Sequence, residues 1–69
     1  MDYVQMGHKI KRARKAQRIT QTDLSQQIGL SPSFIGQIER GEKAASLETL
    51  ESICKALNVS ADYLLGLSA

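Results

Sequence analysis

The side chains with the most specific hydrogen-bonding chemistry lie within residues 20–41. Gln37 carries an amide that donates and accepts together, which matches the N6 and N7 atoms of adenine in the major groove of DNA. Ser33 carries a hydroxyl that can hydrogen-bond to several bases, whereas Pro32 offers apolar contact only. With Gly36 beside them, these small and uncharged residues would let a protein surface approach base edges without burying a charge. We therefore treat this stretch as a candidate base-reading surface.

Positive charge concentrates just before this stretch. Positions 9–18 hold six of the nine basic residues and no acidic residue, whereas positions 46–69 hold three acids and one base. The net charge of the whole chain is only +2. A protein that docks one face on a polyanion shows this asymmetry, and a merely solvated helix face shows it as well. The six residues are Lys9, Lys11, Arg12, Arg14, Lys15 and Arg18.

Two short helices are predicted around the candidate base readers. An S/T-x-x-D pattern that starts at Thr20 suits a helix N-terminus, and Gly29 suits the end of that helix. Ser31 and Pro32 then suit the N-cap and first position of a second helix. A turn of three residues lets the second helix cross the first steeply, so that their apolar residues share one core and the opposite face projects. Residues 20–41 therefore predict a helix-turn-helix unit.

Three further helices are expected from apolar spacing and capping residues. The first runs from Tyr3 to near Arg18, another lies between Ser46 and Asn58, and a last short one follows Ser60. No segment alternates like a strand, so the expected fold is all-α: a compact five-helix bundle forming one domain over 1–69, with the helix-turn-helix in helices 2 and 3. The expected core residues are Val4, Met6, Ile10, Ala13, Leu24, Ile28, Ile35, Ile38, Leu47, Leu50, Ile53, Cys54 and Leu57, and Tyr63 and Leu64 of the last helix could close this core.

Composition and motifs argue against catalysis, metal binding and membrane insertion. A chain of 69 residues leaves little room for a substrate pocket, and His8 lies in a basic stretch without a nucleophile elbow nearby. Cys54 is the single cysteine, so an internal disulfide is impossible, and no Cys/His cluster could hold a metal. No apolar run suits a membrane span or a secretory signal. We expect a cytoplasmic protein that is not an enzyme and needs no cofactor, metal or small-molecule ligand.

Taken together, the motifs resemble the helix-turn-helix family of phage Cro and repressor proteins, also called Xre-type regulators. The similarity runs nearly from end to end. It rests on five segments: ITQTDL at 19–24, IGLS at 28–31, IGQIERGEK at 35–43, SLETL at 46–50 and KALNVS at 55–60.

The resemblance implies roles for individual residues. Gln21 would hold a DNA phosphate, and Arg14 would pair with Glu39 across the first and third helices, which orients the reading helix. Many relatives carry a long polar side chain where this chain has Pro32, so direct base readout would be sparser and DNA shape would contribute to preference. The implied base-facing residues are Ser31, Pro32, Ser33 and Gln37, and the candidate phosphate contacts besides Gln21 are Arg12, Lys15, Arg40 and Lys43.

These observations predict a sequence-specific binder of double-stranded DNA, a transcriptional regulator and in particular a repressor, with helix 32–40 in the major groove. The alternative is a protein-interaction module of the same fold, such as an antitoxin, coactivator or adaptor, because fold alone does not determine the ligand. An interaction helix more often displays aromatic or large apolar anchors. Phe34 is the one such side chain in this helix, and its position also fits packing beside the first helix.

One short reading helix offers few base contacts, so we expect a homodimer on an inverted-repeat operator. The apolar residues Leu65 and Leu67, with Tyr63 at their edge, lie at the end of the chain, where the expected core does not need them. Proteins of the family that the chain resembles often pair through this region. These three residues are therefore the candidate dimer interface.

Overall fold

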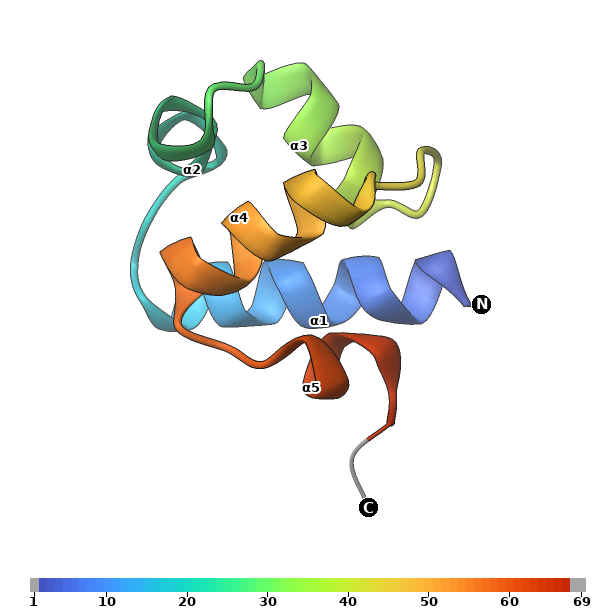
Figure 1. Cartoon of the computed structure of the whole chain (residues 1–69). Helices are drawn as coiled ribbons and strands as arrows, with labels where there is room; N and C mark the ends of the chain where they lie inside the picture. The colour runs from blue at the N-terminus through green and yellow to red at the C-terminus, as the bar shows by residue number, and fades with distance from the viewer. Residues whose placement is uncertain (1, 68–69) are drawn as a thin grey trace.

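Five helices make up the computed structural model, which describes residues 2–67 (Figure 1). Helix α1 contacts α3, α4 and α5, and α2 packs against α3 and α4. Residues 2–67 contain no strand, so the prediction of an all-α five-helix bundle is confirmed. Over the same residues no helix has the length and apolar character that crossing a membrane requires. The helices are α1 (Tyr3–Ala16), α2 (Gln21–Ile28), α3 (Pro32–Glu39), α4 (Leu47–Leu57) and α5 (Ala61–Leu65).

Each helix begins at a residue whose side chain accepts a hydrogen bond from a backbone amide in the first turn. At α2 the cap is reciprocal: the Asp23 amide donates to Thr20 Oγ1 at 2.9 Å, and the Thr20 amide donates to Asp23 Oδ2 at 2.9 Å. The hydrogen bonds from the Thr20 amide and hydroxyl lower the pKa of the Asp23 carboxyl. These caps satisfy amides that a helix leaves free and so fix where each helix starts. The five caps are Asp2, Thr20, Ser31, Ser46 and Ser60.

The turn between α2 and α3 depends on the backbone of Gly29. Its φ of +74° is left-handed, and an added Cβ would meet nothing within 4 Å, so conformation rather than space favours glycine there. Two helix ends differ from expectation by one or two residues. Helix α1 stops at Ala16, because Arg18 has a φ of +59° that cannot continue a helix. Helix α3 stops at Glu39, and Arg40 caps it.

The core is built from all five helices. Two expected members are wrong: Val4 is 51% exposed and Leu47 is 80% exposed. Both lie in the first turn of their helices, before the stretch that packs against neighbouring helices. Cys54 is half-buried, and this burial raises the pKa of its thiol. The buried apolar residues are Met6, Ile10, Leu24, Ile35, Ile38, Leu50, Ile53, Leu57 and Leu64.

Helix α1 crosses the end of α3 in direct backbone contact at Gly7. A Cβ at this position would lie only 2.5 Å from the carbonyl oxygens of Ile38 and Glu39. Because backbone atoms cannot move aside as a flexible side chain can, the contact requires glycine. The contact fixes where α3 crosses α1. It therefore also fixes where the outward-facing side of α3 lies on the surface of the molecule.

Candidate nucleic-acid interface

The ion pair between Arg14 and Glu39 joins α1 to α3. Arg14 Nε donates to Glu39 Oε2 at 2.7 Å, and Arg14 Nη2 donates to Glu39 Oε1 at 3.1 Å. The two side chains are only 8% and 2% exposed. The remaining guanidinium nitrogen, Nη1, donates to the Ile19 carbonyl at 2.8 Å, between α1 and α2. The arginine thus holds a helix on one side and a loop on the other.

Gln21 brings α2 into the same network. This first residue of α2 is half-buried, and its Nε2 donates to Glu39 Oε1 at 3.0 Å. The Glu39 carboxylate therefore accepts from two other helices at once. Among residues 2–67 no buried side-chain nitrogen or oxygen lacks a hydrogen-bond partner, so the network is complete without water or ligand. Gln21 is consequently a positioned residue with its amide already engaged.

A depression of about 470 Å³, here called the recognition groove, runs between the start of α2 and the outer face of α3. Three of the four expected base-facing residues line it, together with two of the expected phosphate contacts. Ser31 does not line the groove. Its hydroxyl caps α3 by accepting a hydrogen bond from the Phe34 amide at 3.1 Å. Lys43 is exposed in the loop beyond α3 and does not line the groove. The lining residues are Gln21, Pro32, Ser33, Gly36, Gln37 and Arg40.

Gly36 differs from expectation, because it is buried instead of projecting outward. The side chains of Arg40 and Gln21 lie over it. An added Cβ would be 3.0 Å from Arg40 Nη1 and 3.6 Å from the Gln21 amide. Gly36 therefore forms part of the groove floor, and the readers that project are Ser33 and Gln37, with Pro32 at the start of the helix.

The six basic residues of α1 and the turn after it separate into different roles. Arg14 is buried in the ion pair, and Lys9 Nζ donates to the Tyr63 carbonyl at 3.0 Å while lying 5.2 Å from the Tyr63 ring centroid. Lys9 thus holds α5 against α1. Arg12 and Lys15 stay exposed on a different side of the helix.

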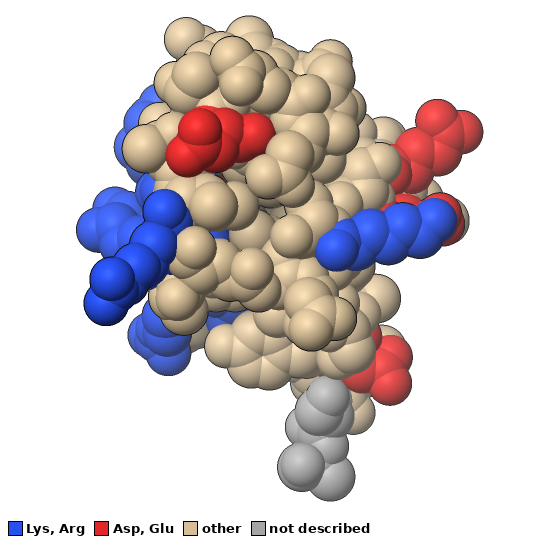
Figure 2. Space-filling model, turned by 90° about the vertical axis from the view of Figure 1, so that its left-hand side faces the viewer, with Lys and Arg blue, Asp and Glu red and all other residues tan. Residues whose placement is uncertain are grey.

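An exposed basic stripe follows α1 beside the recognition groove. It is defined by His8, Lys11, Arg12 and Lys15, which together line one shallow depression. His8 and Lys11 also line a second depression of about 300 Å³ with Gln21, Gly36 and Arg40, so the stripe adjoins the groove. Figure 2 shows lysine and arginine side chains gathered along one edge of the molecule. The sequence places Lys11 in the basic run, but His8 was weighed only as a catalytic residue, although the spacing 8, 11, 12, 15 is that of one helix face.

Arg40 is held at the rim of the recognition groove by Glu42, which the sequence did not indicate as a candidate functional residue. Arg40 Nε donates to Glu42 Oε2 at 2.6 Å, and Arg40 Nη2 donates to Glu42 Oε1 at 3.4 Å. Both side chains are more than half exposed, at 59% and 52%. These hydrogen bonds lower the pKa of the Glu42 carboxyl and raise the pKa of Arg40.

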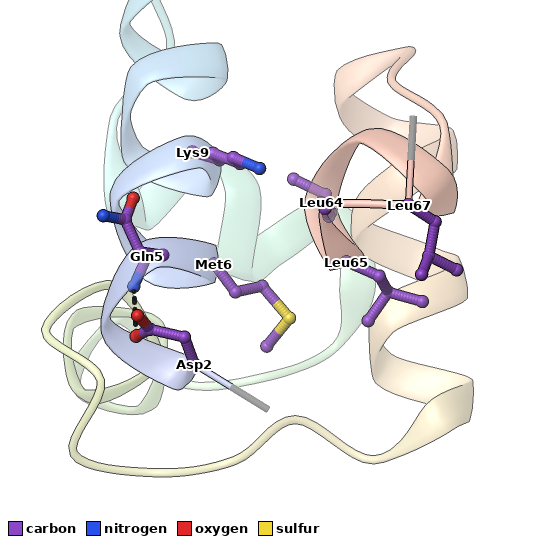
Figure 3. A pocket seen from close by; sticks show the side chains of 8 residues that line it. Asp2, Gln5, Met6, Lys9, Leu64, Leu65 and Leu67 are labelled. Carbon is purple, nitrogen blue, oxygen red and sulfur yellow. Dashed lines mark hydrogen bonds between the residues drawn. The ribbon is translucent and has the colours of Figure 1, made fainter. Parts of the chain in front are cut away.

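A separate apolar surface lies where α5 and the residues after it meet the start of α1. A pocket of about 430 Å³ opens between Met6 of α1 and Leu64, Leu65 and Leu67 (Figure 3). Leu67 is largely exposed, Leu65 is half-buried, and Tyr63 is exposed in the middle of α5. Of the three residues expected at a dimer interface, Leu65 and Leu67 line this pocket and Tyr63 does not.

The chain matches the family model described as helix-turn-helix over residues 10–64. This range contains α2 and α3 with the turn between them, and most of α1, α4 and α5. The chain belongs to the helix-turn-helix family, and the family expected from the sequence is confirmed.

Relatives of this chain include named repressors. It is 36% identical over 61 residues to the immunity repressor protein of Bacillus phage phi105, covering 88% of this chain but only 42% of that repressor. The P22 c2 repressor, solved in complex with a synthetic operator, is 41% identical with a TM-score of 0.82, over 86% of this chain and 89% of the solved one. The restriction-modification controller protein C.Esp1396I, solved as a tetramer on a 35-base-pair operator, is 29% identical with a TM-score of 0.79, over 94% and 86% of the two chains.

We predict that Arg14→Ala and Glu39→Ala each lower the free energy of unfolding by about 3–5 kcal/mol, because each leaves a buried charge without its partner. Replacing both residues by methionine should cost less than the sum of the single changes, since no unpaired charge then remains. Thermal and urea denaturation measure the effect. Glu51→Ala is the control, because Glu51 forms an exposed pair with Lys55 and should change stability by less than about 1 kcal/mol. Unchanged melting temperatures in both single variants would contradict the prediction.

Proposed function

We propose that this chain binds specific sequences of double-stranded DNA and regulates transcription, most simply as a repressor that covers its operator. The observation that carries the proposal is the recognition groove, in which neutral hydrogen-bonding side chains of α3 lie beside Arg40, with Lys11 in the adjoining depression. Neutral side chains suit base edges, and the cations beside them suit the phosphates that flank those edges.

Within the proposed complex α3 enters the major groove. Gln37 reads an adenine, Ser33 hydrogen-bonds to a neighbouring base, and Pro32 packs on a thymine methyl or a sugar. Gln21 keeps its hydrogen bond to Glu39 and donates the second hydrogen of Nε2 to a phosphate from the start of α2, where the free amides of the helix also favour an anion. Ser31 approaches the DNA at the start of α3. The proposed cationic phosphate contacts are Arg12, Lys15, Arg40 and Lys43.

Two observations favour DNA over a protein ligand. Phe34, the one large apolar side chain of α3 that could anchor a partner protein, is half-buried and packs against the core. The outward residues that remain are small and polar, which suits base edges better than an apolar partner surface. The helix-turn-helix family and the named repressors among the relatives agree with this function. A regulator of this kind would work beside the DNA in the cytoplasm and would need no catalytic site.

Selection from a random pool of duplexes tests the proposal. The chain is mixed with the pool at a stated salt concentration, bound duplexes are amplified over several rounds, and the enriched sequence is checked by a mobility shift. We expect one motif to emerge that carries an adenine within reach of Gln37. Failure to enrich any motif would favour a protein-interaction module instead.

On the selected duplex, Gln37→Ala should relax preference at one base pair per half-site by roughly 1–3 kcal/mol, because the bidentate contact to adenine is lost. Binding to a scrambled duplex should hardly change. Gln27→Ala is the matched control, since Gln27 lines a depression with Ser52 and Lys55 on the α4 side, away from α3. An equal loss on all sequences would assign Gln37 to the DNA backbone and not to a base.

Two copies of the chain would read an inverted repeat, with their α3 helices about 34 Å apart. The apolar surface around Leu65 and Leu67 supplies the contact between copies (Figure 3). Tyr63, which is exposed on the same helix as Leu65, extends this contact. An isologous pairing buries the same patch on both copies, which removes the exposed Leu67 side chain from water. Assembly of C.Esp1396I as a tetramer on its operator supports a multimeric arrangement here.

Leu65→Lys with Leu67→Lys should abolish pairing on a palindromic duplex, because four charges would face one another at the contact. Sedimentation with and without duplex measures the assembly. A dimer that neutralises about eight phosphates should give a log–log salt slope near −7, and a monomer about half that value. Full affinity of a single copy for one half-site, unchanged by the two lysines, would refute the proposed pairing.

A further inference from the structure

Arg40 is the one cationic side chain among residues 2–67 that lines the recognition groove, and its side chain is more than half exposed. It lines both depressions on the α3 side, and its Nη1 lies 3.0 Å from the point that a Cβ on Gly36 would occupy. A guanidinium here would meet the first duplex that approaches α3, whatever its sequence. Arg40 is therefore placed to supply affinity that does not depend on bases.

The guanidinium of Arg40 already forms an ion pair with the carboxylate of Glu42. Two hydrogen bonds of 2.6 and 3.4 Å join the pair, in the fork geometry that a phosphate would also accept. A phosphate and the Glu42 carboxylate thus compete for the same donors. Where a phosphate takes the Nε and Nη2 donors of Arg40, the Glu42 carboxylate must give way.

The backbone keeps Glu42 beside Arg40. The amides of Glu42 and Lys43 both donate to the Gln37 carbonyl, at 2.8 and 3.3 Å. Gly41, between Arg40 and Glu42, has a φ of +75° and fits so closely against Val4 that an added Cβ would be 2.8 Å from a Val4 methyl carbon. Glu42 therefore cannot swing far from the rim when it loses its partner, and its charge stays close to the approaching phosphates.

The pair is also weak enough to exchange. Its side chains are more than half exposed, in contrast to the buried pair of Arg14 and Glu39, and exposed pairs contribute little to stability. Exchange costs the loss of the Glu42 contact and the repulsion between its free carboxylate and DNA. Both costs arise at every sequence, because neither involves a base.

We infer that Glu42 is an internal competitor of DNA phosphate for Arg40, and that it lowers the affinity of the chain for all duplexes without altering which base pairs are preferred. The inference rests on the proposed function and adds to it a residue that limits sequence-independent binding. Gln37 would then set the preference among sequences, and Glu42 the general level of affinity.

Dissociation constants on the selected operator and on a scrambled duplex, over a series of salt concentrations, test this inference. Glu42→Gln keeps the size of the side chain and removes its charge. It should tighten binding to both duplexes by a similar factor, about two- to five-fold at low salt. The salt slope should steepen by up to about one unit, because Arg40 would then neutralise one more phosphate and release its counterion from the DNA.

Two controls separate competition from bulk charge. Glu51→Gln makes the same charge change in an exposed pair on α4, outside the recognition groove, and should have little effect. In an Arg40→Gln background, Glu42→Gln should have a clearly smaller effect, because only the repulsion between the Glu42 carboxylate and DNA is then left to relieve. Thermal melting checks that each variant stays folded.

Three contrary results are possible, and each has a different meaning. Weaker or unchanged binding by Glu42→Gln would mean that Glu42 positions Arg40 or does nothing, and would overturn the inference while the wild type still selects its operator. A gain of the same size with and without Arg40 would overturn it in favour of charge repulsion alone. Absence of duplex binding by the wild type would instead overturn the proposed function, and the inference with it.

Discussion

The candidate interface depends on one buried carboxylate, Glu39, and the donors that surround it. Arg14 from α1 and Gln21 from α2 both donate to this side chain of α3, so three helices meet at one group. A buried ion pair roughly balances its own desolvation cost and is therefore a poor source of stability. Its value here is geometric, because the fork of the arginine allows only one orientation of the carboxylate. The angle of α3, and the groove floor at Gly36, follow from that orientation.

Local chemistry explains why the helices were predictable from the sequence. The caps at Thr20, Ser31, Ser46 and Ser60 act within one turn, and the left-handed Gly29 acts within one residue, so none of them needs knowledge of the tertiary fold. The same local reasoning placed Ser33 and Gln37, the candidate base readers, on the outer face of α3, where both line the groove.

Tertiary packing explains what the sequence could not supply. Gly36 is covered by side chains from a neighbouring helix and from the next turn, and Leu47 is left exposed because the packing of α4 begins after its first residue. The basic residues of α1 belong to one run in the sequence, but packing takes Arg14 into the core and Lys9 to Tyr63. Glu42 pairs with Arg40 through the turn at Gly41, which charge counting along the chain does not reveal.

The division between neutral readers and charged rim constrains how such a surface can select a sequence. Contacts to phosphates supply affinity for any duplex, whereas only contacts to base edges distinguish one sequence from another. A reading helix of eight residues with small side chains supplies few of the second kind, so adding cations would raise binding everywhere and dilute preference. A carboxylate at the rim acts in the opposite direction, because it opposes phosphate at every site equally. Selectivity in so small a domain therefore requires a limited number of cationic contacts to phosphates as well as well-placed hydrogen bonds to base edges.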